Sequence, residues 1–311
     1  MRGFNDVYEK IYNEHQEELE KLRKKRVARK RISILIEITV VIFLYLLFRS
    51  FINFKLPAFM EIAIIIVFFT VCFFLRKSKY THYNSNCYYN EVFKQKIIKN
   101  IVKGYNEKLN YIQSGLIKWS LYINGEFEEN FDNFSSEDTI YGLLKEKYKF
   151  VMSEVETQKE YKDDSGILYK KDIFHGLFAF VQLEKWLNTT IKIRKNAKIL
   201  VVDENTRIEM DSSEFEEIFN VYAKDKILAM QILTADVMQM LIDFKNETNI
   251  IPEITIKNYN LYIRLKTEKM FEANMFKDSL DYSTLKKYYD IVKFSVELSE
   301  KLVDNIVQTE I

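Results

Sequence analysis

The histidines, cysteines and acids of this chain are the residues whose types could do chemistry, but their spacing forms no known site. The histidines are His15, His82 and His175, and the cysteines are Cys72 and Cys87. They fall in different predicted segments, and the sequence has no Gly-rich phosphate loop, HExxH, nucleophile elbow or CxxC motif. Two cysteines also exclude a disulfide-stapled scaffold. The sequence therefore predicts no catalytic residue, no metal site and no cofactor.

Residues 203–217, DENTRIEMDSSEFEE, are rich in acids, and carboxylates can bind cations. They lack the alternating oxygen spacing of an EF-hand loop, and capping of a helix start is their simpler role. An enzyme remains an alternative, in which Glu209, Asp211 or Asp225 would serve an inner-leaflet hydrolase or transferase. That alternative requires two carboxylates that converge within about 10 Å in a pocket.

The overall charge is balanced, with 46 basic and 45 acidic residues among 311. No basic stripe is interleaved with aromatic residues, so nucleic-acid binding is not expected. Charged residues make up 29% of the chain and hydrophobic residues 48%, as in a globular protein.

Two long apolar runs predict a transmembrane helical hairpin over residues 32–75. The first run extends from Ile32 to Phe48 and is interrupted only by Glu37; the second extends from Leu56 to Leu75 and is interrupted only by Glu61. About 20 helical residues cross a ~30 Å hydrocarbon layer, so the expected spans are about 32–52 and 56–75. A buried helical hairpin in a soluble core is the alternative.

Basic flanks set the expected orientation of this hairpin. Residues 21–31 contain eight basic residues and no acid, and Arg76, Lys77 and Lys79 follow the second span. Cationic flanks stay in the cytoplasm, so both termini are expected inside, at the inner membrane. The basic cluster expected to touch the lipid bilayer is Arg23, Lys24, Lys25, Arg26, Arg29, Lys30 and Arg31.

The remaining chain divides into an arm, a connector and a domain. Residues 1–31 predict an amphipathic helical arm that docks onto the chain's own C-terminal domain or onto a partner, and residues 76–115 a linker with a connecting helix. Residues 116–311 predict a cytoplasmic α+β domain with an antiparallel sheet, packed helices and a long terminal helix. Its expected strands are a hairpin over 147–186 and the segments KWLNTTIKI, KILVVD, EITIKN and LYIRLKT. Ser212 or Ser213, Asp225 and Thr234 are expected helix N-caps.

Several spaced motifs in this domain resemble the bacterial domain-of-unknown-function 3137 family. They are IFHGLF, FEEIFNVYAKDKILAMQILTADVMQML and LYIRLKTEKMFEANMF. The motif positions are Phe174, Gly176, Phe178, Phe219, Tyr222, Asp225, Thr234, Phe271 and Glu272. The chain departs from the family pattern at His175, where a lysine is common, and at Met230, Gln231 and Ala235. The resemblance implies a membrane-anchored cytoplasmic domain and brings no reaction or cofactor.

The patterns together predict a membrane-anchored cytoplasmic binding or scaffolding module with a protein partner. The hydrolase or transferase and a lipid-sensing module are the alternatives. The sequence does not identify the partner or the oligomeric state.

Overall fold

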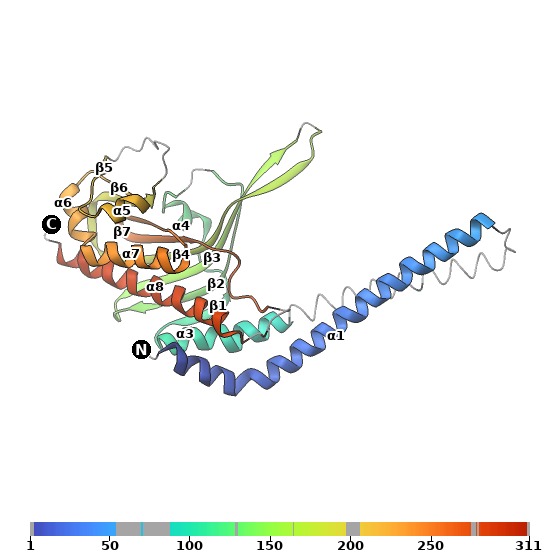
Figure 1. Ribbon diagram of the computed structural model, residues 1–311. Coiled ribbons are helices and arrows are strands. Elements are labelled where there is room, and N and C mark those ends of the chain that lie inside the picture. The colour runs from blue at the N-terminus through green and yellow to red at the C-terminus, as the bar shows by residue number, and fades with distance from the viewer. Residues whose placement is uncertain are drawn as a thin grey trace. The chain divides into compact units, whose positions relative to one another are not determined.

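The computed structural model describes residues 3–53, 70, 88–127, 130–163, 165–196, 206–274, 278 and 280–309 (Figure 1). Two compact units divide the chain. The first comprises residues 1–8, 98–271 and 282–311, and the second residues 9–97 and 272–281. The protein is α+β, with a long N-terminal helix and an antiparallel sheet.

An antiparallel sheet of seven described strands forms the centre of the first unit. The strand order is β1-β2-β3-β4-β6-β5, with β7 also paired to β4. The strands are β1 (Asn110–Ser114), β2 (Asn133–Leu144), β3 (Tyr148–Lys162), β4 (Leu168–Lys195), β5 (Arg207–Ile208), β6 (Phe219–Ala223) and β7 (Pro252–Lys266). The sheet therefore begins at residue 110, inside the segment that the sequence assigns to the connector.

The period-two pattern predicts the β3–β4 hairpin correctly, but it divides the longest strands wrongly. KWLNTTIKI is the end of β4 and not a separate strand. EITIKN and LYIRLKT are both parts of β7, in which Asn258 takes a left-handed φ of 55°. One residue in this conformation bends the strand without ending it, so the polar residues at the bend resemble a turn. KILVVD lies outside the described residues.

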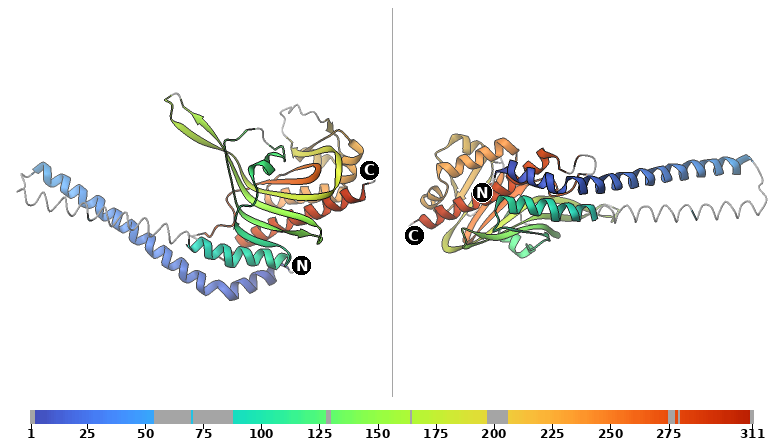
Figure 2. Two further views of the ribbon diagram at one scale, coloured as in Figure 1. Left: turned by 180° about the vertical axis from the view of Figure 1, so that it is seen from behind. Right: turned by 90° about the horizontal axis from the view of Figure 1, so that it is seen from below.

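Helices pack on the sheet of the first unit (Figures 1 and 2). They are α3 (Lys99–Tyr105), α4 (Trp119–Ile123), α5 (Ser213–Ile218), α6 (Lys226–Ile232), α7 (Ala235–Thr248) and α8 (Tyr282–Gln308). The long terminal helix predicted from the 3.6-residue period is α8. It buries a continuous stripe against the domain that includes Leu285, Val292 and Val303.

Strand alternation gives β4 two apolar faces. Phe174 and Phe178 lie in a cluster with Tyr122 of α4 and Tyr262 of β7. The intervening Leu177 is also buried. Because successive side chains point to opposite faces, a continuous apolar run such as this one is typical of a strand covered on both sides.

The second unit contains most of α1 (Phe4–Asn53), a helical stretch over residues 88–93 and the short π-helix η1 (Lys94–Ile98). Lys96 pairs with Glu18, and the Arg26 guanidinium lies 5.0 Å from the centre of the Tyr89 ring. The earlier residue of α1, Glu18, thus meets the later residue of the second segment, Lys96, while Arg26 meets the earlier Tyr89. The two segments therefore run antiparallel.

No single helix among the described residues is long and apolar enough to cross a membrane. The α6–α7 pair passes that test jointly, but it is bent by 64°. The second expected span lies outside the described residues, apart from Thr70, and so do Glu61, Cys72, His82 and Cys87.

Candidate functional site

A β-bulge in β2 brings acidic side chains into the interior of the first unit. The register between β2 and β3 shifts between Glu137 and Ile140, and Asp138 has a left-handed φ of 52°. The hydroxyl of Thr139 fixes the bulge by donating to the Ser114 carbonyl at 2.8 Å and lying 2.7 Å from the Ser153 hydroxyl. Bulges re-aim side chains, and this one directs the Asp138 carboxylate inward.

Three carboxylates meet beside this bulge, and we name Glu137, Asp138 and Glu154 together with His175 the acid–histidine cluster. One oxygen from each carboxylate lies within 4.8 Å of the other two. Asp138 is fully buried and Glu154 is 2% exposed. Glu137 and Glu154 are also register partners on adjacent strands, where like charges repel.

Polar partners surround part of the cluster. The Tyr111 hydroxyl donates to Asp138, and Lys269 Nζ lies 3.0 Å from Glu137 Oε1. The backbone N–H of Met270 donates to Glu154 Oε1 at 2.7 Å. The other oxygen of Glu154, Oε2, is buried and accepts no hydrogen bond from any described residue.

The histidine of the cluster has a defined orientation. His175 Nδ1 lies 3.1 Å from the backbone carbonyl of Thr267, and Nε2 lies 3.3 Å from Glu154 Oε1. A carbonyl oxygen only accepts hydrogen bonds, so Nδ1 carries the proton, and Nε2 is left facing Glu154.

Burial, with a smaller contribution from the nearby Asp138 and Glu137 carboxylates, raises the pKa of Glu154 to about 8, against the opposing hydrogen bond from Met270. A buried carboxylate is otherwise stable only when it is paired or coordinates a cation. The arrangement can therefore hold either a proton or a positive ion.

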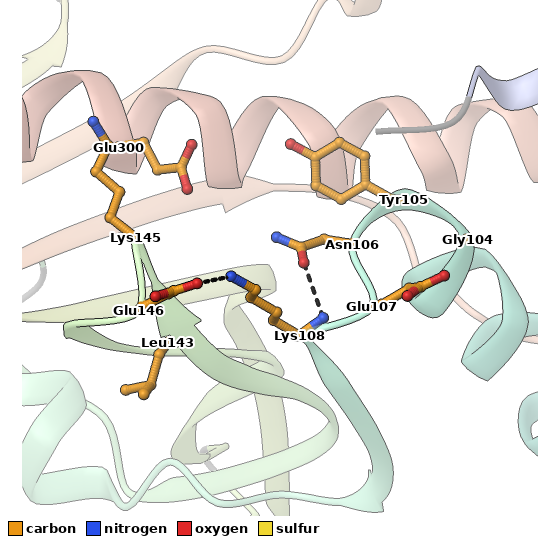
Figure 3. Close-up of a pocket in the computed structure, with 9 residues that line it drawn as sticks. All are labelled: Gly104, Tyr105, Asn106, Glu107, Lys108, Leu143, Lys145, Glu146 and Glu300. Carbon is orange, nitrogen blue, oxygen red and sulfur yellow. Dashed lines mark hydrogen bonds and ion pairs between the residues drawn. The ribbon is translucent and has the colours of Figure 1, made fainter.

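A hollow of about 350 Å³ lies between α3, the β2–β3 turn and α8 (Figure 3). Lys145 and Glu146 form the turn with φ values of 48° and 61°, as in a two-residue type I′ hairpin. The cations of this hollow already have partners: Lys108 pairs with Glu146, and Lys145 pairs with Asp304. Burial raises the pKa of Glu300 on its α8 side. Because its charges are compensated, this pocket favours a charged ligand less than the acid–histidine cluster does.

The start of the N-terminal arm packs onto the domain within the first unit. Phe4 contacts the rings of Tyr282 and Tyr289 on α8, at centroid distances of 5.1 and 5.3 Å. The Tyr282 hydroxyl donates to Asn5 at 2.7 Å. Val7 is buried against Gly104 of α3, where an added Cβ would lie 2.6 Å from both Val7 methyl carbons. The first two turns of the arm therefore dock in cis, one of the two outcomes that the sequence allows.

The motif positions named from the sequence are mostly structural. Phe174 and Phe178 lie in the aromatic cluster with Tyr122, and Phe219 stacks on Phe215. The remaining position of β6, Tyr222, is paired in register with Lys192 of β4. Phe271 is buried against Tyr288.

The other named positions act as caps, contacts or ion-pair partners. Asp225 caps α6 by accepting from the Leu228 N–H at 3.0 Å, as expected. Thr234 occupies the N-cap position of α7 but its side chain caps no N–H; it accepts from Asn305 instead. A Cβ on Gly176 would lie 2.1 Å from the Leu265 carbonyl oxygen, so close packing requires glycine there. In the second unit, Glu272 pairs with Lys94 at 2.7 Å.

The acids of the enzyme alternative lie at exposed or helix-capping positions. Glu209 and Asp211 are exposed, and Asp225 serves as a helix cap. The basic cluster of the arm is also not uniformly available to lipid: Arg26 is buried and Arg23 pairs with Glu20 at 2.6 Å. In contrast, Glu137, Asp138 and Glu154 are not predicted from the sequence. Glu154 carried a usable signal, because it follows Phe150 and Met152 at inward-facing positions of the predicted hairpin.

Comparison with known proteins confirms the family resemblance. Residues 172–303 match the model of the family described as protein of unknown function (DUF3137). The match covers β4 to α8 and includes His175, whereas Glu137, Asp138 and Glu154 precede it.

A solved structure, that of the mycobacterial trehalose monomycolate transport factor A, TtfA, is similar at 7% identity with a TM-score of 0.30. The similarity covers 63% of this chain and 95% of that chain, and at this level it carries no argument about fold or function. None of the curated proteins matches this chain.

Proposed function

We propose that this protein is a membrane-anchored binding module whose α+β domain lies at the cytoplasmic face of the inner membrane. The observation that carries the anchoring is the surface of α1 beyond Arg31. Large apolar side chains there are 39–63% exposed: Ile32, Ile34, Leu35, Ile38, Ile42, Leu44 and Leu46. Such a concentration on one helix is unfavourable in water and favourable in hydrocarbon.

The antiparallel contacts of the second unit support a hairpin. From Arg26 to Asn53, α1 rises by about 40 Å at ~1.5 Å per residue. Tyr89, which follows the second apolar run in the sequence, lies beside Arg26. Both ends of the apolar segment therefore lie on one side, where the basic residues before Ile32 and after Leu75 favour the cytoplasm.

Alkaline extraction of membranes tests the anchor. We expect the wild type to remain in the membrane pellet, and the double variant Leu35→Arg/Ile38→Arg to be released. The matched control is Ile227→Arg on α6, because Ile227 is 72% exposed and Ile38 is 51% exposed. Release of the wild type, or retention of the double variant, would contradict the anchor.

A labelling experiment tests the side of the membrane. Ser165 is an exposed residue of the β3–β4 loop. In a chain with both native cysteines replaced by serine, a Ser165→Cys thiol should react with an impermeant maleimide only after the cells are permeabilised. Labelling of intact cells would place the domain outside.

The binding role is supported by an exposed apolar face on and before α4. Leu116, Trp119 and Ile123 are 49%, 60% and 43% exposed; Trp119 and Ile123 lie one turn apart on α4, and Leu116 precedes the helix. A photo-crosslinking residue at position 119 should yield one discrete protein adduct in cells, and the same residue at exposed Lys287 on α8 should not. An identical adduct pattern at both positions, or none at position 119, would refute this face as the binding surface.

A further inference from the structure

The acid–histidine cluster places the deeply buried carboxylate of Glu154 beside two others, those of Glu137 and Asp138. Lys269 pairs with Glu137 at 3.0 Å on the exposed side of the cluster. The residues next to them in the sheet, including Ile140 and Met152, are buried and apolar. Burying the Glu154 carboxylate in such surroundings is costly, and a bound cation is one of the few arrangements that removes the cost.

We propose that Glu137, Asp138, Glu154 and His175 form a binding site for a divalent first-row metal ion. The carboxylate oxygens already lie within 4.8 Å of one another. Three ligands about 2.1 Å from one metal ion lie roughly 3–3.6 Å apart, so the carboxylates must draw together by about 1 Å or more to complete the site. Side-chain rotation within the bulge supplies that adjustment.

An observation that is independent of the clustering indicates a missing partner. Glu154 is 98% buried, yet its Oε2 accepts no hydrogen bond from the described residues. Buried carboxylate oxygens nearly always have a partner. Glu154 Oε1, in contrast, is held by the Met270 N–H, which fixes the carboxylate in place. A metal ion would be the partner of the oxygen that remains.

The orientation of His175 matches that of a metal ligand. Ligating histidines usually donate one ring N–H to a carbonyl or carboxylate, which leaves the other nitrogen for the metal. In this structure Nδ1 faces the Thr267 carbonyl at 3.1 Å, and Nε2 lies 3.3 Å from Glu154 Oε1. The Thr267 N–H also bonds to the His175 carbonyl at 3.2 Å, so the backbone that positions the ring is itself held.

The donor set selects the class of ion. Three carboxylates alone would suit Mg²⁺ or Ca²⁺, whereas the imidazole shifts the preference toward Mn²⁺, Fe²⁺ or Zn²⁺. A divalent ion leaves one net negative charge on three carboxylates, and the Lys269 ammonium beside Glu137 offsets it. The Glu137 side chain is 44% exposed, which gives the ion a route from solvent.

Metal titration of the purified full-length protein tests the site. After dialysis against a chelator, Mn²⁺ is titrated and followed by electron paramagnetic resonance, and Zn²⁺ is measured by equilibrium dialysis. We expect one ion per chain, and at least a tenfold loss of affinity in both Glu154→Gln and Glu137→Gln. His175→Gln should also remove the nitrogen hyperfine coupling from the bound Mn²⁺.

The matched control is Glu184→Gln, an exposed acid on the neighbouring strand β4 that pairs with Lys147. It should bind like the wild type. If the buried variants misfold, Glu137→Gln still tests the site, because Glu137 is the partly exposed acid of the cluster. Circular dichroism checks the fold of each variant. Absence of stoichiometric binding by the wild type at millimolar free ion, or equal binding by Glu137→Gln and Glu184→Gln, overturns the proposal.

Discussion

Replacing Gly104 by alanine measures how strongly the N-terminal arm is docked on the domain. The new Cβ would lie 2.6 Å from both methyl carbons of Val7 and 3.2 Å from its Cβ. Valine is short and branched, so it cannot turn away without moving α1. Overpacking of this kind costs about 1–3 kcal/mol. Alanine also raises the helix propensity of α3. This gain is the same with the arm docked or undocked, so it does not change the docking equilibrium.

The expected effect is therefore a shift of the local opening equilibrium by roughly 5- to 150-fold. Hydrogen exchange of the full-length protein in detergent reports it at the amides of the first turns of α1. Those amides should exchange faster in Gly104→Ala, while the amides of β4 keep their protection. Gly3→Ala is the matched control in the same arm, because its Cβ would meet nothing closer than 3.8 Å.

A double variant separates a steric effect from a general loss of stability. Val7→Ala removes the two colliding methyl groups and loses about 1.5 kcal/mol of apolar burial. In that background, Gly104→Ala should change the exchange rate little. Equal effects of Gly104→Ala in the presence and absence of the Val7 methyls would refute the contact, and so would an unchanged exchange rate in the single variant.

Three further substitutions follow from the packing of the sheet. Gly176→Ala should lower the unfolding free energy by more than about 3 kcal/mol in thermal melts, because the Leu265 carbonyl oxygen that it meets is backbone. Arg264→Leu should cost about 3–5 kcal/mol by denaturant titration, because Glu253, 2.5 Å from the guanidinium, is left unpaired; an unchanged midpoint would contradict this. With chelator present, the unfolding free energy of the wild type should fall by a few kcal/mol as the pH rises from about 4.5 to 8. Over this range the unfolded chain releases the Glu154 proton, whereas the folded chain, in which the pKa of Glu154 is raised to about 8, keeps it. Glu154→Gln should flatten this slope.

The elements with a strong period were predictable from the sequence. The β3–β4 hairpin alternates apolar and polar residues, and α8 repeats apolar residues at helical spacing. Asp225 was predictable as a cap because an acid directly before a helix start has a short-range role. In each case the deciding interactions lie within a few residues of one another.

The site was not predictable, because its residues depend on long-range register. Asp138 and Glu154 are 16 positions apart and meet only because a bulge shifts the β2–β3 pairing by one residue. His175 joins them from the next strand. Sequence alone does not place such a bulge, since Asp138 in a left-handed conformation leaves no composition signal. The partial signal was Glu154, a charge at an inward-facing position.

The two buried charged sites of the sheet differ in a way that favours a ligand at only one. The Arg264 guanidinium has Glu253 as its partner, and it also lies 4.8 and 4.7 Å from the rings of Phe127 and Phe174. That site is complete without any added group, so it needs no role beyond structure. Glu154 is more deeply buried, but one of its oxygens has no hydrogen-bond partner among the described residues, and carboxylate oxygens of Glu137 and Asp138 lie within 4.8 Å.

Stability alone would not select this second arrangement. An apolar side chain at position 154 would remove both the repulsion and the burial of the carboxylate. An unfavourable backbone conformation at Asp138 and a buried carboxylate at Glu154 occur at the same place. This is expected of a site that is completed by a ligand. The metal titration asks whether that ligand is a cation.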